Sequence, residues 1–321
     1  LPESRVALIQ AVGSLEQNRT KLIDYLATNL NQPSHEVRET ALRELGNFKS
    51  LPVSLHKSLS EQLRDERKDV RGLAVQAIVL IQSKRDETAQ LVVEAIGDES
   101  HYVREQALLA AANLGGDSAR VVVEVIQDQL NDDSPSVKIA AIESLARIGA
   151  DARSTFDAMA ELSLDADASV RQTAVKSLRS LKPETERLLP ILIRAVEDGE
   201  WEVRRHAAQE LGEMEEAAAP AVPALLNMLR QDDDSDAARQ ALREINTAGD
   251  EAVPLLLEIV QDDDAGRRSR YYALYLLRKM GPRAKAAIPV LRTLLEESDG
   301  RYREYYERAI REIEGEDEDE E

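Results

Sequence analysis

The chain has 321 residues, no cysteine, and 61 acidic against 41 basic side chains, which gives a net charge of −20. The lack of cysteine excludes disulfides, thiolate metal sites and a cysteine nucleophile. The acidic balance argues against a general nucleic-acid or anionic-membrane binder, because neutralising phosphates requires clustered cations. No apolar run approaches the roughly 18 residues that a membrane span needs. We therefore expect neither nucleic acid nor membrane as a partner.

The N-terminus begins Leu1-Pro2 without an initiator methionine, and no signal peptide is visible. This start indicates an excised domain or a processed form. The absence of cysteine does not choose between the cytosol and an exported compartment, and we favour the cytoplasm.

One pattern returns along the chain at intervals of 32 to 34 residues. It consists of a Val-Arg-like pair, a small or apolar residue three positions on, an aliphatic residue seven on and an apolar residue ten on. Its Arg position falls on Arg5, Arg38, Arg71, Arg104, Lys138, Arg171, Arg204, Ala238, Arg270 and Arg303. A fixed period of this size predicts a stack of helical repeats, each packed on its neighbours.

The repeat around Arg171 shows how each unit is built. Apolar residues follow two helical stripes, and the polar segment 165–169 between them reads as a tight turn rich in N-cap residues. Positions −1, +3, +4, +7 and +10 from the Arg share one face of the second helix. Position +3 is mostly Ala, which lets neighbouring helices approach closely. Glycines 115, 116, 149, 249 and 281 follow second helices, where a C-cap favours positive φ.

An acidic residue stands six positions before most of the Arg positions. It occurs as Asp65, Asp98, Asp132, Asp165, Asp198, Asp232, Asp264 and Glu297. Such a residue precedes the second helix and can cap it, or pair with the Arg of its own repeat or of a neighbour. We expect a ladder of Asp–Arg pairs along the turns.

The Asp…Val-Arg…Ala…Leu pattern on paired helices resembles the HEAT-repeat family, in particular the short bacterial HEAT-like repeats of phycobilisome lyases. First-helix segments with an internal proline, such as 189–192, 222–225, 253–256 and 288–291, are similar too, and we expect each proline to kink its helix. The resemblance implies an all-α, right-handed α-solenoid of about ten HEAT-like helical hairpins, with second helices on the concave face. We count nine complete pairs, because the unit around Arg5 lacks its first helix. The predicted solenoid covers residues 1–313, and an acidic disordered tail covers 314–321.

Catalytic chemistry finds little support in the sequence. Of the four histidines, His35 and His101 occupy equivalent turn positions two repeats apart, roughly 20 Å by helix-packing distances, so they cannot share a metal. His35-Glu36 is the sole His-Glu pair, where the di-iron hydroxylases of this fold have four. The HEAT-like DNA glycosylases use a basic groove with tryptophan, whereas this chain is acidic and has only Trp201. We expect no catalytic residue, metal or cofactor, and therefore a non-catalytic scaffold or adaptor. The alternative is a subunit of a chromophore-lyase-like or other HEAT-repeat enzyme.

The last two repeats differ from the others, because they hold six of the eight tyrosines. Residues 265–311 carry twelve basic and five acidic side chains. Helical phase places Tyr302 and Tyr306 at core positions, and it places positions +2 and +5 toward solvent. Exposed Tyr beside Arg is typical of an interaction hot spot, although large side chains could also cap the end of the solenoid. The predicted partner-binding residues are Tyr272, Tyr275, Tyr305, Arg278, Arg301 and Arg308.

We expect this C-terminal patch to engage an acidic or phosphorylated segment of a partner protein. The tail, Glu316 to Glu321, could fold back on the patch and compete with such a partner, or serve only as a solubilising terminus. One repeat breaks the pattern, because Ala237-Ala238 replaces Val-Arg in the eighth unit. The ladder should be interrupted there, which predicts a flexible joint.

Overall fold

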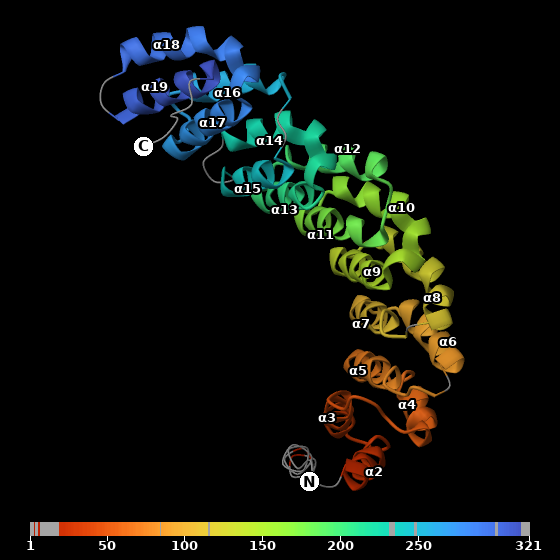
Figure 1. The fold of residues 1–321 in the computed structure, drawn as a ribbon. Coiled ribbons are helices and arrows are strands. Elements are labelled where there is room, and N and C mark those ends of the chain that lie inside the picture. The colour runs from red at the N-terminus through yellow and green to blue at the C-terminus, as the bar shows by residue number, and fades with distance from the viewer. Residues whose placement is uncertain are drawn as a thin grey trace. The chain divides into compact units, whose positions relative to one another are not determined.

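The computed structural model describes residues 3, 6, 19–83, 85–114, 116–230, 235–246, 249–298 and 301–315. Within these ranges the chain forms nine pairs of antiparallel helices, in which each first helix contacts the second helix that follows it (Figure 1). The expected nine pairs are therefore present, whereas the unit around Arg5 lies outside the described residues. The chain divides into two compact units, Leu1–Lys182 and Pro183–Glu321.

The N-terminal unit contains two layers of helices (Figure 1). Its first helices are α2 (Arg19–Asn29), α4 (His56–Gln62), α6 (Arg85–Ile96), α8 (Gly116–Asp128) and α10 (Phe156–Glu161). Its second helices are α3 (His35–Gly46), α5 (Lys68–Ile78), α7 (His101–Ala111), α9 (Pro135–Ile148) and α11 (Ala168–Ser177). Each second helix packs beside the second helix of the next repeat, so the second helices form a continuous row within the unit.

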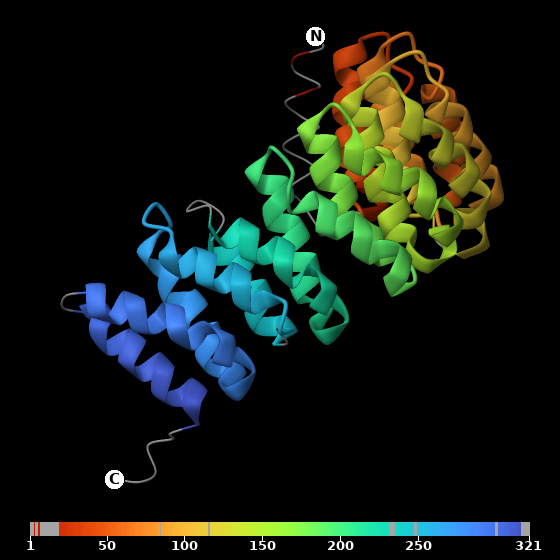
Figure 2. The same cartoon turned by 90° about the horizontal axis from the view of Figure 1, so that it is seen from above.

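The C-terminal unit repeats this arrangement, as the view from above also shows (Figure 2). Its first helices are α12 (Thr185–Ala195), α14 (Val222–Leu229), α16 (Ala252–Gln261) and α18 (Ile288–Glu297). Its second helices are α13 (Trp201–Gly212), α15 (Ser235–Ile245), α17 (Arg267–Met280) and α19 (Arg301–Glu314). Here too the second helices contact one another in sequence order. The described chain is an α-solenoid in both units.

The apolar positions of the repeat build the core, as the helical phase predicts. In α3, Val37, Ala41, Leu42 and Leu45 are all buried, and they correspond to positions −1, +3, +4 and +7. In α15 the Ala at position +3, Ala241, lies close to α13, because a Cβ added to Gly212 would be 3.2 Å from its Cα. Burial of such stripes along the described repeats provides the main stabilisation of the stack.

The Asp–Arg ladder of the N-terminal unit runs between repeats, not within them. Arg38 Nε donates to Asp65 Oδ2 at 2.8 Å, and Arg71 Nε donates to Asp98 Oδ2 at the same distance. The next pairs are Arg104–Asp132 at 2.8 Å and Lys138–Asp165 at 2.7 Å. Each cation therefore binds the carboxylate of the following turn.

The ladder arginines Arg38, Arg71, Arg104, Arg171 and Arg204 also bind backbone carbonyls in the turn of their own repeat. Arg71 Nη1 donates to the backbone carbonyls of Asp65 and Glu66 at 2.9 and 3.2 Å. Asp98, in turn, accepts the backbone N–H of Ser100 at 2.8 Å. The sequence left open whether the arginine contacts its own turn or that of a neighbour, and it contacts both. Its guanidinium binds the carboxylate of the next repeat, and it also binds the backbone carbonyls of its own turn.

The eighth repeat departs from the ladder, as the missing arginine predicts. Ala238 is buried at the ladder position, and Arg230, which follows α14, pairs with Asp262 at 2.8 Å instead. Arg230 therefore supplies the cation for the next turn from outside the second helix. The ladder carboxylate predicted for that turn is Asp264, not Asp262, and Asp232, predicted for the eighth repeat, lies outside the described residues.

Helix ends follow the glycine prediction only in part. Gly149 and Gly281 have φ values of +70° and +54° and end α9 and α17. The prediction is wrong for Gly116, which begins α8, and for Gly249, which is not among the described residues with positive φ. Gly115 lies outside the described residues.

The prolines of the first helices are placed differently from the prediction. Pro190 is inside α12, but Pro223 and Pro289 occupy the first turns of α14 and α18. Each of these two helices follows a 3₁₀ segment, Glu215–Ala221 or Gly281–Ala287. A proline in the first turn lacks only an N–H that would be unpaired anyway, so it starts the α-helix and does not kink it.

Candidate functional site

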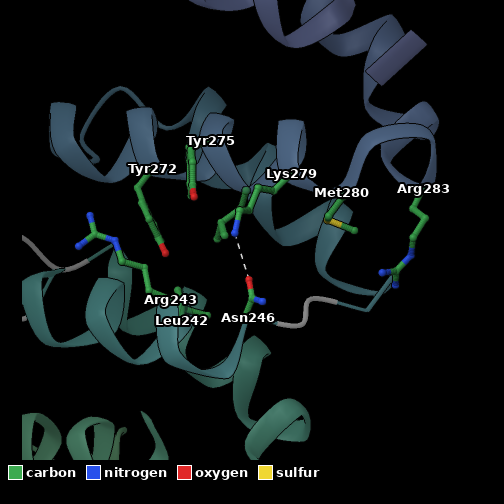
Figure 3. Close-up of a pocket in the computed structure, with 9 residues that line it drawn as sticks. Leu242, Arg243, Asn246, Tyr272, Tyr275, Lys279, Met280 and Arg283 are labelled. Carbon is green, nitrogen blue, oxygen red and sulfur yellow. Dashed lines mark hydrogen bonds between the residues drawn. The ribbon is translucent and has the colours of Figure 1, made fainter. Parts of the chain in front are cut away.

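A pocket of about 470 Å³ lies between α15 and α17 in the C-terminal unit (Figure 3). We call it the α15–α17 pocket. Arg243 and Asn246 line it from the α15 side, and Tyr272, Tyr275 and Lys279 line it from α17. The two tyrosine side chains extend from α17 toward α15, with their rings stacked at a centroid distance of 5.5 Å. Two phenols and two cations thus converge on one cavity.

Tyr272 is the most buried of these groups, with 3% of its surface exposed. Its hydroxyl has no hydrogen-bond partner among the described residues. Burial raises the pKa of Tyr272 to about 12, although the positive charge of Arg243 opposes this effect. The phenol therefore stays protonated at neutral pH and keeps a donor that the surrounding protein does not use.

The cations of the α15–α17 pocket are held by neutral groups. The Arg243 guanidinium lies over the Tyr272 ring, 5.5 Å from its centroid, and Lys279 Nζ is 5.8 Å from the centroid of Tyr275. Lys279 also donates to Asn246 Oδ1 at 3.1 Å. Within the described part of the chain, neither Arg243 nor Lys279 forms an ion pair with a carboxylate.

Two further arginines near this pocket are each paired with a carboxylate. Burial lowers the pKa of the neighbouring Arg239 guanidinium, and the charges of Arg268 and Arg243 lower it further. Arg239 forms an ion pair with Asp236. At the rim, Arg283 Nε pairs with Asp250 Oδ1 at 2.9 Å, and both side chains are more than half exposed. The positive charge that no described carboxylate pairs with in this pocket therefore comes from Arg243 and Lys279.

A second aromatic surface lies on the other side of α17, facing α19. We call it the α17–α19 surface, and it encloses a shallow hollow of about 410 Å³. Tyr271 and Tyr305 meet there edge to face, with ring centroids 5.0 Å apart. Arg267 and Arg268 are exposed beside them, and Tyr271 itself is 46% exposed.

The six residues predicted for partner binding are therefore not one cluster. Tyr272 and Tyr275 line the α15–α17 pocket, whereas Tyr305 belongs to the α17–α19 surface. Arg278 and Arg308 both bind Glu312, at 2.7 and 2.9 Å.

Glu312 shows the effect of this double pairing. Burial alone would raise its pKa, but hydrogen bonds from Arg278 and Arg308 bring it below the ordinary value. The charges of the two arginines are thus partly neutralised within the solenoid. Arg301 begins α19, and its side chain lies outside what the structure describes.

The expectation that position +2 faces solvent is wrong for part of the repeats: Gln240 is exposed and Thr173, His206 and Tyr305 are half-buried, but others are buried. Thr40, Gln106 and Tyr272 all occupy this position, and all three are buried. The reason is that position +2 faces the second helix of the preceding repeat: Gln106 of α7 accepts a hydrogen bond from Gln76 of α5. Tyr306 is buried as predicted, and Tyr302 is half-buried beneath Arg270, whose guanidinium lies 5.1 Å from its ring centroid.

Sequence reasoning missed Arg243, Asn246, Tyr271 and Lys279. Asn246 offered a signal that could have been found, since Asn is frequent in the left-handed conformation at helix ends, and its φ is +50° at the end of α15. Arg243, Tyr271 and Lys279 could be recognised only once it was known which neighbouring helix packs against each side of α15 and α17.

The described residues contain neither a candidate metal centre nor a candidate membrane span. No group of three or more His, Asp or Glu side chains there is placed to hold a metal ion. No helix in the described ranges has the length and apolar character required to cross a membrane.

Comparison with known proteins extends these observations. The profile of the HEAT repeats family matches residues 56–146, 156–222 and 222–311. Integrator complex subunit 4 of Mus musculus is 30% identical over 156 residues, which cover 38% of this chain and 16% of that protein. The chain thus spans only a small part of this relative's length.

Solved structures show the same fold. A crystal structure of importin beta superposes with a TM-score of 0.57 at 16% identity, covering 98% of this chain and 50% of that one. The complex of CpcE and CpcF of phycocyanin lyase from Nostoc sp. PCC7120 has a TM-score of 0.43 at 19% identity, covering 70% and 93% of the two chains. This last likeness is too low to support an argument about activity. The profile matches most of the chain, and the helix pairs and inter-repeat ladder agree with it: the protein belongs to the HEAT-repeat family.

Proposed function

We propose that this protein is a non-catalytic scaffold that binds a partner protein through the second helices of its C-terminal unit. The observation that carries the proposal is the α17–α19 surface, where Tyr271 is 46% exposed and packs edge to face on Tyr305. Tyrosine and arginine are enriched at interface hot spots, because a rigid aromatic ring buries a large area at a low entropic cost. Arg267 and Arg268 flank the pair as exposed cations.

The geometry favours a partner segment with acidic side chains. Among the described residues, Arg267 and Arg268 form no ion pair, so their charges are available to an incoming carboxylate or phosphate. Along the row of second helices, α15, α17 and α19 would present several such contacts at fixed spacing, which suits an extended partner. Each contact would be weak, and binding would depend on their combination.

The proposal is tested by partner capture from extract of the source cells, with mass-spectrometric readout. Wild-type protein is compared with a Tyr271→Ser/Tyr305→Ser variant, after circular dichroism confirms equal helix content. We expect a specific partner to be retained by the wild type and lost by this variant. Trp201→Ser is the matched control, because Trp201 is also a 46% exposed aromatic residue on a second helix of the same unit. Equal retention by the wild type and the double variant would contradict the proposal.

A further inference from the structure

The α15–α17 pocket has donors and positive charge without an acceptor to match them. Tyr272 is 97% buried and its hydroxyl is unpartnered among the described residues. A buried donor without an acceptor is unfavourable, and an acceptor supplied by a ligand would remove that cost. Figure 3 shows this side chain directed from α17 toward Arg243, with the Tyr275 hydroxyl pointing the same way.

The cations in the pocket add a second, independent indication of an anionic ligand. Arg243 contacts the face of Tyr272, and Lys279 contacts Asn246 and the ring of Tyr275. Neither contact neutralises a charge. Two like charges held near one cavity repel each other, and an anion between them would remove that repulsion.

The number of charges and donors selects the kind of anion. A phosphate monoester carries between −1.5 and −2 charges at neutral pH and three acceptor oxygens. These match the two cations Arg243 and Lys279 together with the phenols of Tyr272 and Tyr275. A carboxylate has one charge and two oxygens, and it would leave a donor group and a charge unsatisfied.

We infer that the α15–α17 pocket binds the phosphate group of a phosphorylated serine or threonine in the partner protein. Arg243 and Lys279 hold the phosphate, and the Tyr275 hydroxyl donates to it from α17. When Arg243 turns from the Tyr272 ring toward the ligand, the covered Tyr272 hydroxyl gains an acceptor. The inference rests on the proposed function, since it gives the scaffold a partner whose binding depends on phosphorylation.

The full chain is titrated against a short phosphoserine peptide, with ³¹P NMR as the readout. The same peptide carrying Ser or Glu in place of phosphoserine is measured by calorimetry. We expect the phosphopeptide to bind at least tenfold more tightly than either counterpart. Charge-assisted hydrogen bonds contribute about 1.5–3 kcal/mol each, so Arg243→Ala and Lys279→Ala should each weaken binding about tenfold or more.

Two further variants make the test specific. Tyr272→Phe retains the buried ring and removes only the hydroxyl, and we expect it to weaken phosphopeptide binding severalfold while the thermal unfolding temperature is kept or raised. Arg43→Ala is the matched control, because Arg43 occupies the position in α3 that Arg243 occupies in α15 but pairs with Glu39. This control should bind like the wild type.

Three results would overturn the inference. Equal affinity for the Glu peptide would show a general acidic-segment site, and equal affinity for inorganic phosphate would show a small-anion site. Unchanged binding by the Arg243→Ala variant would place the phosphate elsewhere. Because the probe is a synthetic peptide, these results do not depend on Tyr271 and Tyr305, so failure here is distinguishable from failure of the capture experiment.

Discussion

Gly72 of α5 and Tyr102 of α7 come into close contact. A Cβ atom added to Gly72 would lie 2.6 Å from Cε1 of the Tyr102 ring, nearer than real side-chain contacts allow. Gly72 is in the interior of α5, where glycine is less favourable than alanine by about 1 kcal/mol. The Tyr102 ring therefore determines the identity of residue 72, against its helix propensity.

The effect of Gly72→Ala should change sign with the residue at position 102. In the wild type we expect a loss of about 1–3 kcal/mol in the free energy of unfolding, because overpacking exceeds the gain in helix propensity. In a Tyr102→Ala background the same substitution should stabilise by about 1 kcal/mol. Urea unfolding of the four proteins in this cycle measures both values. The same sign in both backgrounds would show that the ring is not the cause.

At the scale of the helix pair, the ladder cation that pairs with the carboxylate of the next turn determines how much that contact stabilises the stack. Arg71 and Asp98 have side chains only 10% and 13% exposed, and Arg71 also binds two carbonyls of its own turn. In repeat eight, Arg230 pairs with Asp262 from a side chain that is 41% exposed. Ion pairs that remain solvated contribute little to stability. We therefore expect the Arg230–Asp262 pair to stabilise the contact between repeats less than the Arg71–Asp98 pair does.

Arg71→Ala should therefore destabilise the protein more than Arg230→Ala. The first variant leaves Asp98 and two turn carbonyls without their donor, which costs about 1–3 kcal/mol. Thermal and urea unfolding of both variants, with Arg43→Ala as a surface control, checks the order. If Arg230→Ala lowers the free energy of unfolding as much as Arg71→Ala does, burial does not determine how much each ion pair stabilises the protein.

For the molecule as a whole, the ladder connects stability to pH. Burial alone would raise the pKa values of Asp98, Asp132 and Asp165. Hydrogen bonds from the ladder cation and from a turn N–H more than offset that effect, and each pKa lies below its ordinary value. An unfolded Asp has a pKa of about 3.9, so the unfolded chain binds more protons than the folded one under acid conditions.

The ladder should stabilise fully above about pH 4 and progressively less as the pH falls through the folded pKa values. We expect the free energy of unfolding to decrease over this range. An Asp98→Asn/Asp132→Asn/Asp165→Asn variant should be less stable at pH 7 and should lose less on acidification. Urea unfolding at several pH values between 2.5 and 7 measures both slopes. Parallel pH profiles for variant and wild type would contradict this origin of the acid sensitivity.

The sequence alone determined the repeat, its helices and their buried faces. Val37, Ala41 and Leu45 are buried because the 3.6-residue period places them on one side of a helix, and this is a local property. Gly149 and Gly281 could be predicted for the same reason, since a left-handed helix end is a local conformation. The period of about 33 residues then required that such units stack.

Only the tertiary structure decided which repeat supplies each partner. Asp98 binds the arginine of the preceding repeat, Tyr272 is buried against α15, and Arg278 shares Glu312 with Arg308. Apart from Arg308–Glu312, which lies within α19, these contacts join residues about one repeat apart in sequence. Their geometry depends on how neighbouring second helices pack side by side. Helical phase gives the direction of a side chain on its own helix, but the helix that meets it there is fixed by the packing of the next repeat.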